Sequence, residues 1–485
     1  MRTWPGLVAL SVVIGGAGCS AAHPEFDGKS YTAPAPGSPW KPASGEVPTV
    51  LKAERPPPLP AALQAPAATP LTSAELIDAA LQINPSTRAA WENARAAAAA
   101  WAASRGRYYP SVGAGMFAQY AHGGVPTEFD DVSETIQGVG AATSYLLLDF
   151  GGRSATVEAA RQALIAANWT QNRTIQAVVY QVARTYYDLV GSEAEVRAAE
   201  TSLQEALTSV RATQERLKTG VGTIADVLQA QSDEAQRRLD LVTVRGQARI
   251  DHGALATAVG WAANTEFSVA EPADAIPVDA IRESVDELIA RAEHDRPDLA
   301  AGRAAVLQAE AGVRVAESAL WPRLVGGASV ERKYVQDGSA PNATSYLFGL
   351  GVEIPIFEGF ALVNAVREAR ANVDASRARL QTLSEAVMND VWKAYYDFRT
   401  AADQVQATEA LFASAAESFR VWSGLYRGGA ADIVELLNAQ TLLARARAEV
   451  VRTHTALYRS YAAVVFAVGA RPGGLGAETR DGSSG

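Results

Sequence analysis

The sequence has few of the residues that disulfides, thiol chemistry and metal sites require. Its 485 residues include one cysteine, three methionines and five histidines, and the formal net charge is −10. A single cysteine excludes a disulfide within the chain and argues against a cysteine-based metal site. The acidic balance argues against a nucleic-acid partner. With no nucleophile motif and no metal-ligand spacing among the histidines, we expect no enzymatic activity, no metal and no cofactor beyond a covalent lipid.

Long hydrophobic runs are also scarce. Only one segment is apolar enough to cross a membrane as a helix, and it is short and N-terminal. Residues 1–18 have the charged start, apolar middle and small-residue end of a secretory signal peptide. Cys19 resembles the lipid-attachment cysteine of bacterial lipoproteins, although Gly16 stands where such signals usually carry leucine. Ser20, in place of aspartate, suits sorting to the outer membrane by the same resemblance. An unmodified cysteine is the alternative.

Proline is unevenly distributed. Twelve of the 23 prolines lie between Pro24 and Pro70, in a stretch with few large apolar residues. Such a composition does not build a core, and it predicts an extended, lipid-anchored tether over residues 19–71. Residues 470–485 are rich in glycine and polar residues and predict a disordered tail.

The rest of the chain is a duplication. The segments TSAELIDAALQINPSTRAA and SVDELIARAEHDRPDLAAG begin at Thr72 and Ser284 and share a helix-starting capping box and a proline. Further on, ARTYYDLV matches WKAYYDFR, and LKTGVGTIADVLQAQ matches YRGGAADIVELLNAQ. We therefore expect repeat one over residues 72–260, a connecting equatorial segment over 261–283, and repeat two over 284–469.

Each repeat contains a pair of segments with alternating residues, at 108–150 and 321–357. In the second pair, large apolar side chains line one face and small or polar residues the other; the large ones are Tyr346, Phe348, Leu350, Val352 and Ile354. Tyrosine-bearing segments of about ten residues with a period of two, joined by polar loops, are typical of transmembrane β-strands. A soluble β-hairpin gives the same pattern and stays open at this point.

Long helices follow the strands. Apolar residues recur every seven positions from Ile175 to Leu217 and again from Val391 to Tyr426, which indicates a heptad seam. No proline interrupts 153–218, so this helix can run for roughly 65 residues, or about 100 Å. The pattern predicts long antiparallel helical hairpins over 153–260 and 360–469, with shorter helices stacked end to end beside them.

Glycines mark the points where the chain changes course. Gly151, Gly152 and Gly359 stand where a strand runs into a long helix, and glycine tolerates the backbone dihedrals that a sharp change of direction needs. Gly220 and Gly429 mark the turns at the far ends of the long helices. A phosphate-binding loop is the alternative at the first junction, but the GxxxxGK[ST] pattern is missing.

The motifs LLLDFGGR, YYDL and RLKTGVGTIADVLQAQ, with their second copies, resemble the TolC-like outer membrane factor family and its lipoprotein branch, from Leu71 to Gly469. The resemblance implies a mixed α/β membrane protein of the Gram-negative outer membrane. It forms a homotrimer with a 12-stranded transmembrane β-barrel, four strands from each chain, continued into the periplasm by an antiparallel coiled-coil α-helical barrel. Independently, four strands cannot close a membrane barrel, because the smallest have about eight.

The resemblance also implies a function. Such proteins are exit ducts of tripartite drug efflux pumps, where they meet a periplasmic adaptor protein and an inner-membrane transporter, and of type I protein secretion systems. A periplasmic coiled-coil adaptor is a further alternative, but an adaptor has a compact β-domain instead of strands that enter the helices. The sequence does not specify the exported substrate.

Carboxylates follow both hairpin turns, at Asp226, Asp432 and Glu435. One interpretation is ordinary helix N-terminal charge, which interacts favourably with the helix dipole. The resemblance adds a periplasmic gate, in which Asp226 links the outer hairpin to the inner one by engaging Tyr426. Ala431 stands where some relatives carry an arginine, so the resemblance implies a closed state with one salt bridge fewer.

Overall fold

The computed structural model describes most of the two repeats and little of the N-terminal segment. The described residues are 33–40, 70–123, 132–272, 276, 280–336 and 341–470. The expected signal peptide, the candidate lipidation site Cys19 and the expected tail beyond residue 470 lie outside them.

The same series of elements occurs twice along the described part of the chain. Repeat one contains α1 (Ser73–Ile83), α2 (Pro85–Arg105), the short 3-10 helix η3 (Gly106–Tyr108), β1 (Ser111–Gly123), β2 (Val132–Leu148), α3 (Gly152–Lys218) and α4 (Ile224–Val259). Repeat two contains α5 (Val285–Asp295), α6 (Pro297–Ser318), β3 (Arg323–Gln336), β4 (Ala343–Glu353), α7 (Ala361–Arg427) and α8 (Ile433–Val468).

The two long hairpins match in length as well as in order. Helices α3 and α7 each have 67 residues, and α4 and α8 each have 36. Both ends of α3 and α4 are related to those of α7 and α8 by one constant difference of 209 in residue number. Each residue of one hairpin therefore has a defined counterpart in the other.

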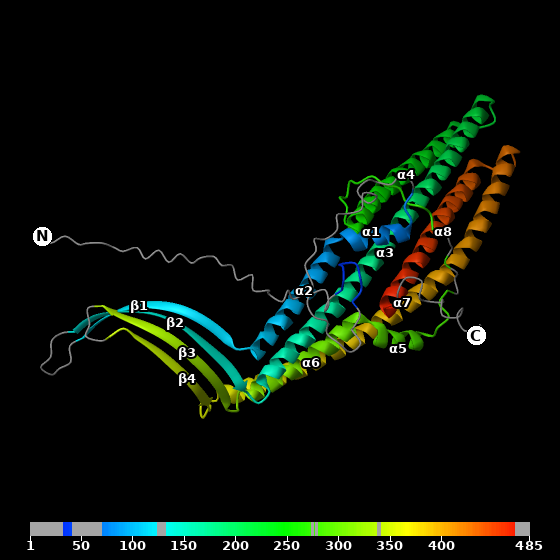
Figure 1. Ribbon diagram of the computed structural model, residues 1–485. Helices are drawn as coiled ribbons and strands as arrows, with labels where there is room; N and C mark the ends of the chain where they lie inside the picture. Colours follow the sequence, from blue (N-terminus) through cyan, green and yellow to red (C-terminus); the bar gives the residue numbers. More distant parts are fainter. Residues whose placement is uncertain are drawn as a thin grey trace, which may run out of the picture.

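The strands form one antiparallel sheet in the order β1-β2-β3-β4. The central pair, β2 and β3, joins the two repeats, with Thr143 opposite Ala328. In the described residues, β1 and β4 have a neighbour on one side only. The curved sheet projects from one end of the helical body, so the molecule is elongated, with strands at one end and helix turns at the other (Figure 1).

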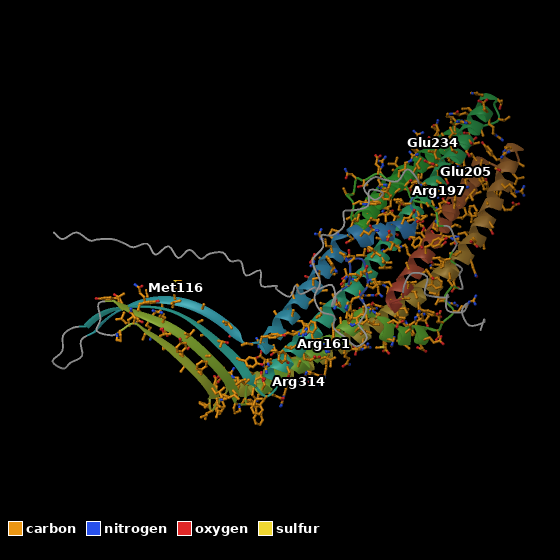
Figure 2. All side chains as sticks on the ribbon, viewed as in Figure 1. Met116, Arg161, Arg197, Glu205, Glu234 and Arg314 are labelled. Atoms are coloured by element: carbon orange, nitrogen blue, oxygen red, sulfur yellow. The ribbon has the colours of Figure 1, made fainter. Side chains whose placement is uncertain are left out.

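Large apolar side chains on the sheet are exposed. On β4, Leu350 is 75% exposed and Leu347, which points to the opposite face, is 69% exposed. Met116 on β1, labelled in Figure 2, is 74% exposed. Among the described residues, no element covers either face of this sheet at these positions.

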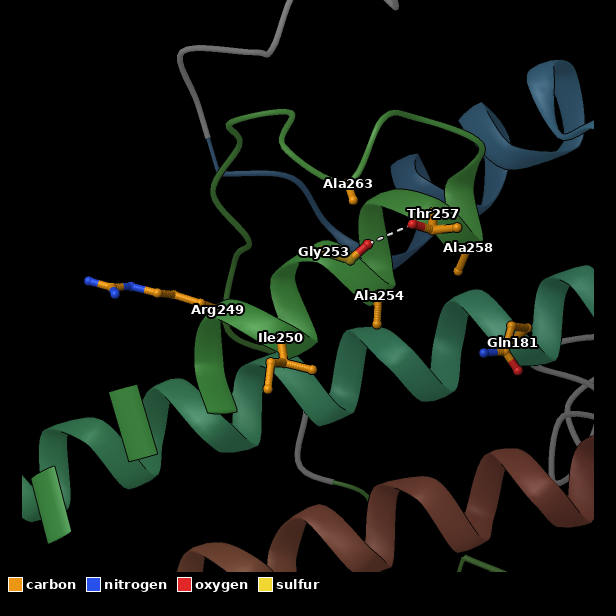
Figure 3. Close-up of a pocket in the computed structure, with 8 residues that line it drawn as sticks. All are labelled: Gln181, Arg249, Ile250, Gly253, Ala254, Thr257, Ala258 and Ala263. Carbon is orange, nitrogen blue, oxygen red and sulfur yellow. Dashed lines mark hydrogen bonds between the residues drawn. The ribbon is translucent and has the colours of Figure 1, made fainter. Parts of the chain in front are cut away.

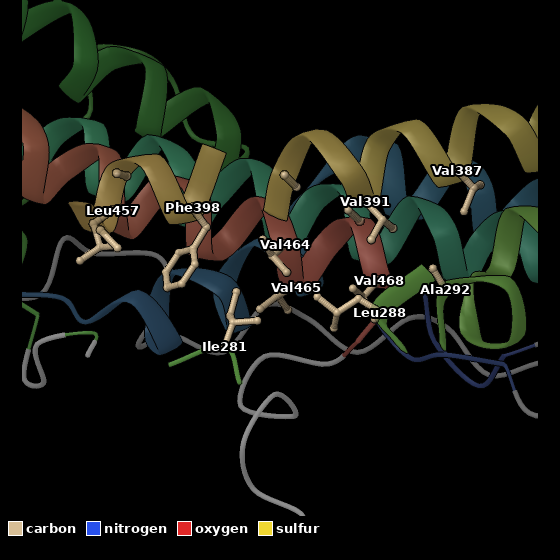
Figure 4. Packing of buried hydrophobic residues seen from close by; sticks show 14 of the residues in the cluster. Ile281, Leu288, Ala292, Val387, Val391, Phe398, Leu457, Val464, Val465 and Val468 are labelled. Carbon is tan, nitrogen blue, oxygen red and sulfur yellow. The ribbon is translucent and has the colours of Figure 1, made fainter. Parts of the chain in front are cut away.

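The helical body has its largest apolar core at the middle of repeat two. Val391, Phe398 and Val405 from the heptad seam of α7 are buried there, against Leu457 of α8 and Leu288 of α5 (Figure 4). No helix of the described residues combines the length and the hydropathy that a membrane crossing requires.

The heptad expectation is wrong for the last third of α3. Leu217, its final member, is 37% exposed, whereas small polar side chains such as Ser202, Ser209 and Thr213 are buried there. The cause is that α3 packs against α8 of repeat two as well as against α4 of its own hairpin. A helix with two neighbours buries two faces, and the second face uses small residues.

Residues 33–40 do not form a free tether. The indole Nε1 of Trp91 donates to the carbonyl of Ala33 at 2.8 Å. Asn172 on α3 pairs with both backbone groups of Trp40, accepting from its N–H at 2.7 Å and donating to its carbonyl at 2.9 Å. The expectation that this stretch does not pack is wrong for residues 33–40, because side chains of α2 and α3 form hydrogen bonds with its backbone N–H and C=O groups.

Each strand-to-helix junction contains two successive residues with positive φ. They are Phe150 (49°) and Gly151 (95°) in repeat one, and Gly359 (59°) and Phe360 (64°) in repeat two. At corresponding positions the glycine and the phenylalanine have changed places. The glycines meet the expectation of an unusual backbone conformation, whereas the two phenylalanines in the left-handed region were not anticipated.

Gly152 serves a different purpose from the one expected. It is the first residue of α3 and does not have a positive φ. A Cβ at this position would lie 2.3 Å from the hydroxyl oxygen of Ser318 on α6. Gly152 is therefore required by the close approach of α3 to α6, and not by its own dihedral angles.

We expect Gly151→Ala to lower the free energy of unfolding by about 1–2 kcal/mol, because an L-residue in the left-handed region carries that cost. Gly113→Ala on β1 is the matched control, since its φ is ordinary and nothing lies within 4 Å of a Cβ there. Urea titration in detergent measures both. Equal losses in the two variants would contradict the assigned role.

Candidate functional site at the hairpin tips

The turns of the two long hairpins lie together at the end of the molecule opposite the sheet (Figure 1). Gly220 and Gly429, the expected turn residues, both have φ of 77°. In each turn the backbone N–H groups that follow the helix donate back to its last carbonyls, as those of Val221 and Gly222 do to Arg216. This is the usual way in which a glycine in the left-handed region ends a helix.

All three predicted carboxylates stand at helix starts. Asp226 forms a reciprocal capping box with Thr223: its carboxylate accepts from the Thr223 N–H at 2.8 Å, and its own backbone N–H donates to the Thr223 hydroxyl at 3.2 Å. Asp432 is the N-cap of α8 and accepts from the N–H of Val434 at 2.7 Å. Glu435 lies in the first turn of α8. The helix-start interpretation is therefore confirmed for each of them.

Asp432 and Glu435 also interact with each other. A hydrogen bond from the Glu435 side chain lowers the pKa of Asp432, and the N–H groups of Val434 and Glu435 lower it further. One oxygen of Glu435, Oε2, is buried without a hydrogen-bond partner. The pair places negative charge at the tip of the hairpin.

Tyr426 is 4% exposed and packs with Ile433, Leu436 and Leu437. Arg216, from the end of α3, lies over its ring at 4.7 Å and donates to its backbone carbonyl at 2.7 Å. Together with Ala212 of α3, which packs on the same apolar cluster, this arginine joins the two hairpins near their tips. Sequence reasoning missed Arg216, although a basic residue in the last turn of a long helix is a recognisable C-terminal signal.

The link from Asp226 to Tyr426 stays a prediction. Burial raises the pKa of the Tyr426 hydroxyl, with Arg216 opposing the shift and Asp226 adding to it, so the Asp226 charge acts on this side chain. In the part of the chain that the structure describes, no hydrogen bond joins the two residues.

Above the tips, the seam between the two hairpins is polar. Ser209 on α3 donates to Gln440 on α8 at 2.8 Å, and Gln440 in turn donates to Asp233 on α4 at 3.3 Å. Arg237 on α4 pairs with Asp233 at 3.0 Å and is itself 8% exposed. Polar contacts of this kind hold the hairpins together while leaving fewer apolar contacts to break if they separate.

A buried ion cluster lies near the middle of the molecule. Arg296, 3% exposed, pairs with Asp298 at 2.7 Å and Asp390 at 3.1 Å and donates to the carbonyl of Ala467 at the end of α8. Arg173 on α3 pairs with Asp298 at 3.4 Å. Burial, with the charge of Arg296, lowers the pKa of Arg173 to about 10. The cluster fastens the C-terminus of α8 to repeat one.

The corresponding place in repeat one is neutral. Asn84 donates to the carbonyl of Ala258 at the end of α4 at 2.8 Å. The two repeats therefore use the same helix-end contact with different chemistry. No group of three or more potential metal ligands occurs among the residues that the structure describes.

Comparison with known proteins agrees with this two-repeat architecture. The chain matches the family model described as "Outer membrane efflux protein" over residues 76–261 and 288–470, which together make up more than half of its length. The chain belongs to the outer membrane efflux protein family. The two matched stretches correspond to the two repeats of the structure.

Similar members of this outer membrane efflux protein family include Protein CyaE of Bordetella pertussis, 29% identical over 84% of this chain and 85% of that protein. Pyoverdine export outer membrane protein OpmQ of Pseudomonas aeruginosa is 25% identical over 68% of this chain and 69% of its own length. Cation efflux system protein CusC of Escherichia coli K12 is 25% identical over 61% of this chain and 65% of that protein.

Solved structures show the same fold. The outer-membrane channel OprN superposes with a TM-score of 0.73 at 20% identity, covering 82% of this chain and 90% of OprN. The outer membrane protein VceC from Vibrio cholerae gives 0.72 at 19% identity, covering 82% and 96%. The predicted resemblance to this family is thereby confirmed.

We expect Arg296→Met to lower the free energy of unfolding by about 1.5–3 kcal/mol, because hydrogen bonds to charged groups contribute that much and two carboxylates lose their buried cation. Arg420→Met is the control: Arg420 is 73% exposed and pairs with Glu417, 60% exposed, so its loss should change stability far less, because solvent screens a surface ion pair. Urea titration compares them. A larger loss in the Arg420 variant would contradict the assignment.

Proposed function

We propose that this protein is the outer-membrane channel component of a tripartite efflux pump, a passive exit duct for small molecules across the periplasm and the outer membrane. The observation that supports this most is the continuity of the strands with helices of 67 residues, which are about 100 Å long at 1.5 Å per residue. The strands, which have the residue pattern of transmembrane β-strands, lead directly into helices that are long enough to extend into the periplasm.

The proposed assembly is a homotrimer. Four strands are too few to close a membrane barrel, so three copies supply twelve strands to one barrel in the outer membrane. The outer edges of β1 and β4, each with one neighbour in the described residues, are the edges that would pair between copies. The helices continue the barrel as a coiled-coil α-barrel in the periplasm.

The proposed partners are a periplasmic adaptor protein and an inner-membrane transporter. Two relatives are named for small cargos, pyoverdine and cations, which favours small-molecule efflux over type I protein secretion. The adaptor alternative requires a compact β-domain, whereas the described strands form one open sheet with exposed faces. No enzymatic step is needed for a duct.

The mass of the purified protein tests the assembly. In mild detergent we expect about three times the chain mass of 51.0 kDa, plus bound detergent. A monomer that binds no detergent would refute the proposed function.

We expect Leu350→Arg to impair membrane insertion by about 2–4 kcal/mol, because Leu350 is on the face proposed to meet lipid and a charge near the midplane costs that much. Gly349→Ser, on the other face, is the control, since nothing lies within 4 Å of a Cβ there. Heat-modifiable migration of membrane extracts measures the inserted fraction. The lipid-facing assignment is wrong if both variants insert alike.

The hairpin tips are the proposed periplasmic gate. We expect Tyr426→Phe combined with Asp226→Ala to raise single-channel conductance in planar bilayers, and Arg216→Met to raise it as well, because these residues join or act on the facing tips. A hydrogen bond to a charged group contributes about 1.5–3 kcal/mol, and repetition in three copies suffices to bias an open-closed equilibrium. Neutralising Asp432 and Glu435 should lower cation selectivity.

Two controls make the gate result decisive. Assembly is verified for every variant, and Ser423→Ala on the last turns of α7, where the exposed hydroxyl bonds only the carbonyl of Arg420, should leave conductance unchanged. Unchanged conductance in the double variant would leave Asp226 with its helix-capping role alone.

A covalent lipid on Cys19, palmitate among its acyl chains, is the proposed membrane anchor of the N-terminus. Mass spectrometry of the mature N-terminus should find a chain that begins at Cys19 and carries the lipid. Cys19→Ala should leave part of the protein in the membrane, since the barrel supplies its own anchoring. A mature chain that begins elsewhere would exclude lipidation at this residue.

A further inference from the structure

The two faces of the sheet can be told apart position by position. Successive side chains of a strand point to opposite faces, so the register of β1, β2, β3 and β4 assigns each strand residue to one of the two. We call the face that carries Leu350 the lipid face and the face that carries Gly349 the lumen face, in keeping with the proposed function.

Charged residues are distributed unequally between these faces. On the lumen face Arg323 pairs with Glu353 at 3.1 Å, and Lys333 pairs with Glu331 at 3.6 Å. On the lipid face, where the structure describes the side chains, Arg332 is the only aspartate, glutamate, lysine or arginine. Arg332 is exposed and forms no ion pair with another described residue. It is therefore an isolated charge on the surface proposed to meet lipid.

An arginine without an ion pair is ordinary where water solvates it. Arg249 on α4 is such a residue: Figure 3 shows its side chain extended away from the helices, beside a groove of about 650 Å³ lined by α3, α4 and the following loop. On a surface that faces lipid, water is missing, and a charge near the midplane of the membrane is costly. Arg332 therefore requires a place near the headgroups and an anionic partner there.

The position of Arg332 along β3 meets the first requirement. It lies nine residues after Arg323, where β3 begins, and four residues before Gln336, where it ends. At about 3.3 Å per residue and a tilt of about 40°, nine residues span about 23 Å of height, and the apolar band of a membrane barrel is about 25 Å tall. With the helices in the periplasm, Arg332 stands at the outer-leaflet edge of this band.

Repeat one supports the same level independently. The first residues of β1 and β3, Ser111 and Arg323, differ by 212 in number, and Tyr120 and Arg332 each lie nine residues further on. Tyr120 is on the lipid face and is 67% exposed. Exposed tyrosines gather where a barrel surface leaves the hydrocarbon for the headgroups. Both repeats therefore carry an interface residue at this level, and in repeat two it is charged.

The side chain of Arg332 leans toward the loop end of its strand. Its guanidinium carbon lies 5.3 Å from the centre of the Tyr334 ring, and Tyr334 is two residues further from the helices on the same face. Thr344 is opposite Arg332 on β4, and Gln137 is opposite Tyr334 on β2, so polar side chains surround this end. Long basic side chains in membranes bend in this way to bring their charge to the interface.

Arg332 also stays accessible in the proposed trimer. Strand β3 is an inner strand with β2 on one side and β4 on the other. Pairing between copies would use the outer edges of β1 and β4, and it would leave the face of β3 uncovered. The group that meets Arg332 therefore comes from the membrane.

We propose that Arg332, stacked on Tyr334 and flanked by Thr344 and Gln137, binds a phosphate group of lipopolysaccharide in the outer leaflet. A guanidinium presents paired N–H donors that match two phosphate oxygens, and it is less strongly hydrated than an ammonium group. Lipopolysaccharide carries its lipid A phosphates where acyl chains give way to sugars, which is the level of Arg332. The site rests on the proposed function, which places the loop end of the sheet in the outer leaflet.

Native mass spectrometry of the full-length protein in detergent tests the site, with bisphosphorylated lipid A as the probe. Arg332→Gln should lower lipid A occupancy several-fold, because the amide cannot replace the positive charge. Arg332→Lys should keep part of it, since a point charge replaces the planar fork. Lys333→Gln is the matched control: it removes the same charge one residue away, on the lumen face, and should leave occupancy unchanged.

Two further probes identify the chemistry, and EDTA is present throughout so that no divalent cation bridges protein and lipid. Lipid A without phosphates should bind the unmodified protein and Arg332→Gln alike. Phosphatidylglycerol should show little dependence on Arg332. A variant that loses phosphatidylglycerol and keeps bisphosphorylated lipid A would show that the ligand is a phospholipid and would overturn the assignment to lipopolysaccharide.

The outcomes separate the site from the proposed function, once the mass and heat-modifiable migration of every variant have been checked. A trimer in which only the Arg332 variants lose lipid A supports the site. A trimer in which Arg332→Gln and Lys333→Gln bind lipid A equally overturns the site and leaves the function standing. A monomer that binds no detergent overturns both.

Discussion

The constraint on which this structure depends is that a helix of 67 residues is stabilised mainly by the side chains that pack along its length. Helices this long gain little from propensity alone, and their stability comes from packing of an apolar or close-packed face. Helix α3 meets this constraint inside the chain, because α4 covers one side and α6 and α8 cover the other. Helix α7 has the same length, but among the described residues it packs against α5, α6 and α8 of its own repeat and has no contact that corresponds to the one between α3 and α8.

Helices with a regular hydrophobic repeat were predictable from the sequence. Residues whose burial or contacts depend on a second neighbouring helix were not. The helix expected over 153–218 runs from Gly152 to Lys218, because heptad spacing without proline leaves one interpretation. Leu217 was misassigned, since periodicity reports one buried face and α3 has two. Arg216 was missed because its partner Tyr426 comes from the other repeat. The left-handed Phe150 and Phe360 were missed because only glycine signals such a backbone in a sequence.

The two repeats have kept their geometry and diverged in charge. Asn84 and Arg296 both hold the last turn of the helix that ends their repeat, yet only Arg296 stands among carboxylates. The cluster around Arg296 also includes Arg173 on α3, through Asp298, so it connects the two repeats. The hydrogen bond of Asn84 connects elements of repeat one only. Burying a charge is costly unless partners surround it, which explains why the arginine and both aspartates occur together.

The same divergence separates the contact between α3 and α8 from the corresponding surfaces of α7 and α4. If the corresponding positions of the two hairpins had identical chemistry, nothing would distinguish α3 and α8 from their counterparts α7 and α4 as partners. Arg447 with Glu205 and Arg459 with Asp188 favour the internal pairing, because no such pairs exist among the counterparts. The glycines act in the same direction, since Gly191 fits Thr455, whereas two threonines facing each other would clash. Charge and size together therefore favour the pairing of α3 with α8 over any pairing of their counterparts α7 and α4 with these helices, although the backbones of the two hairpins are alike.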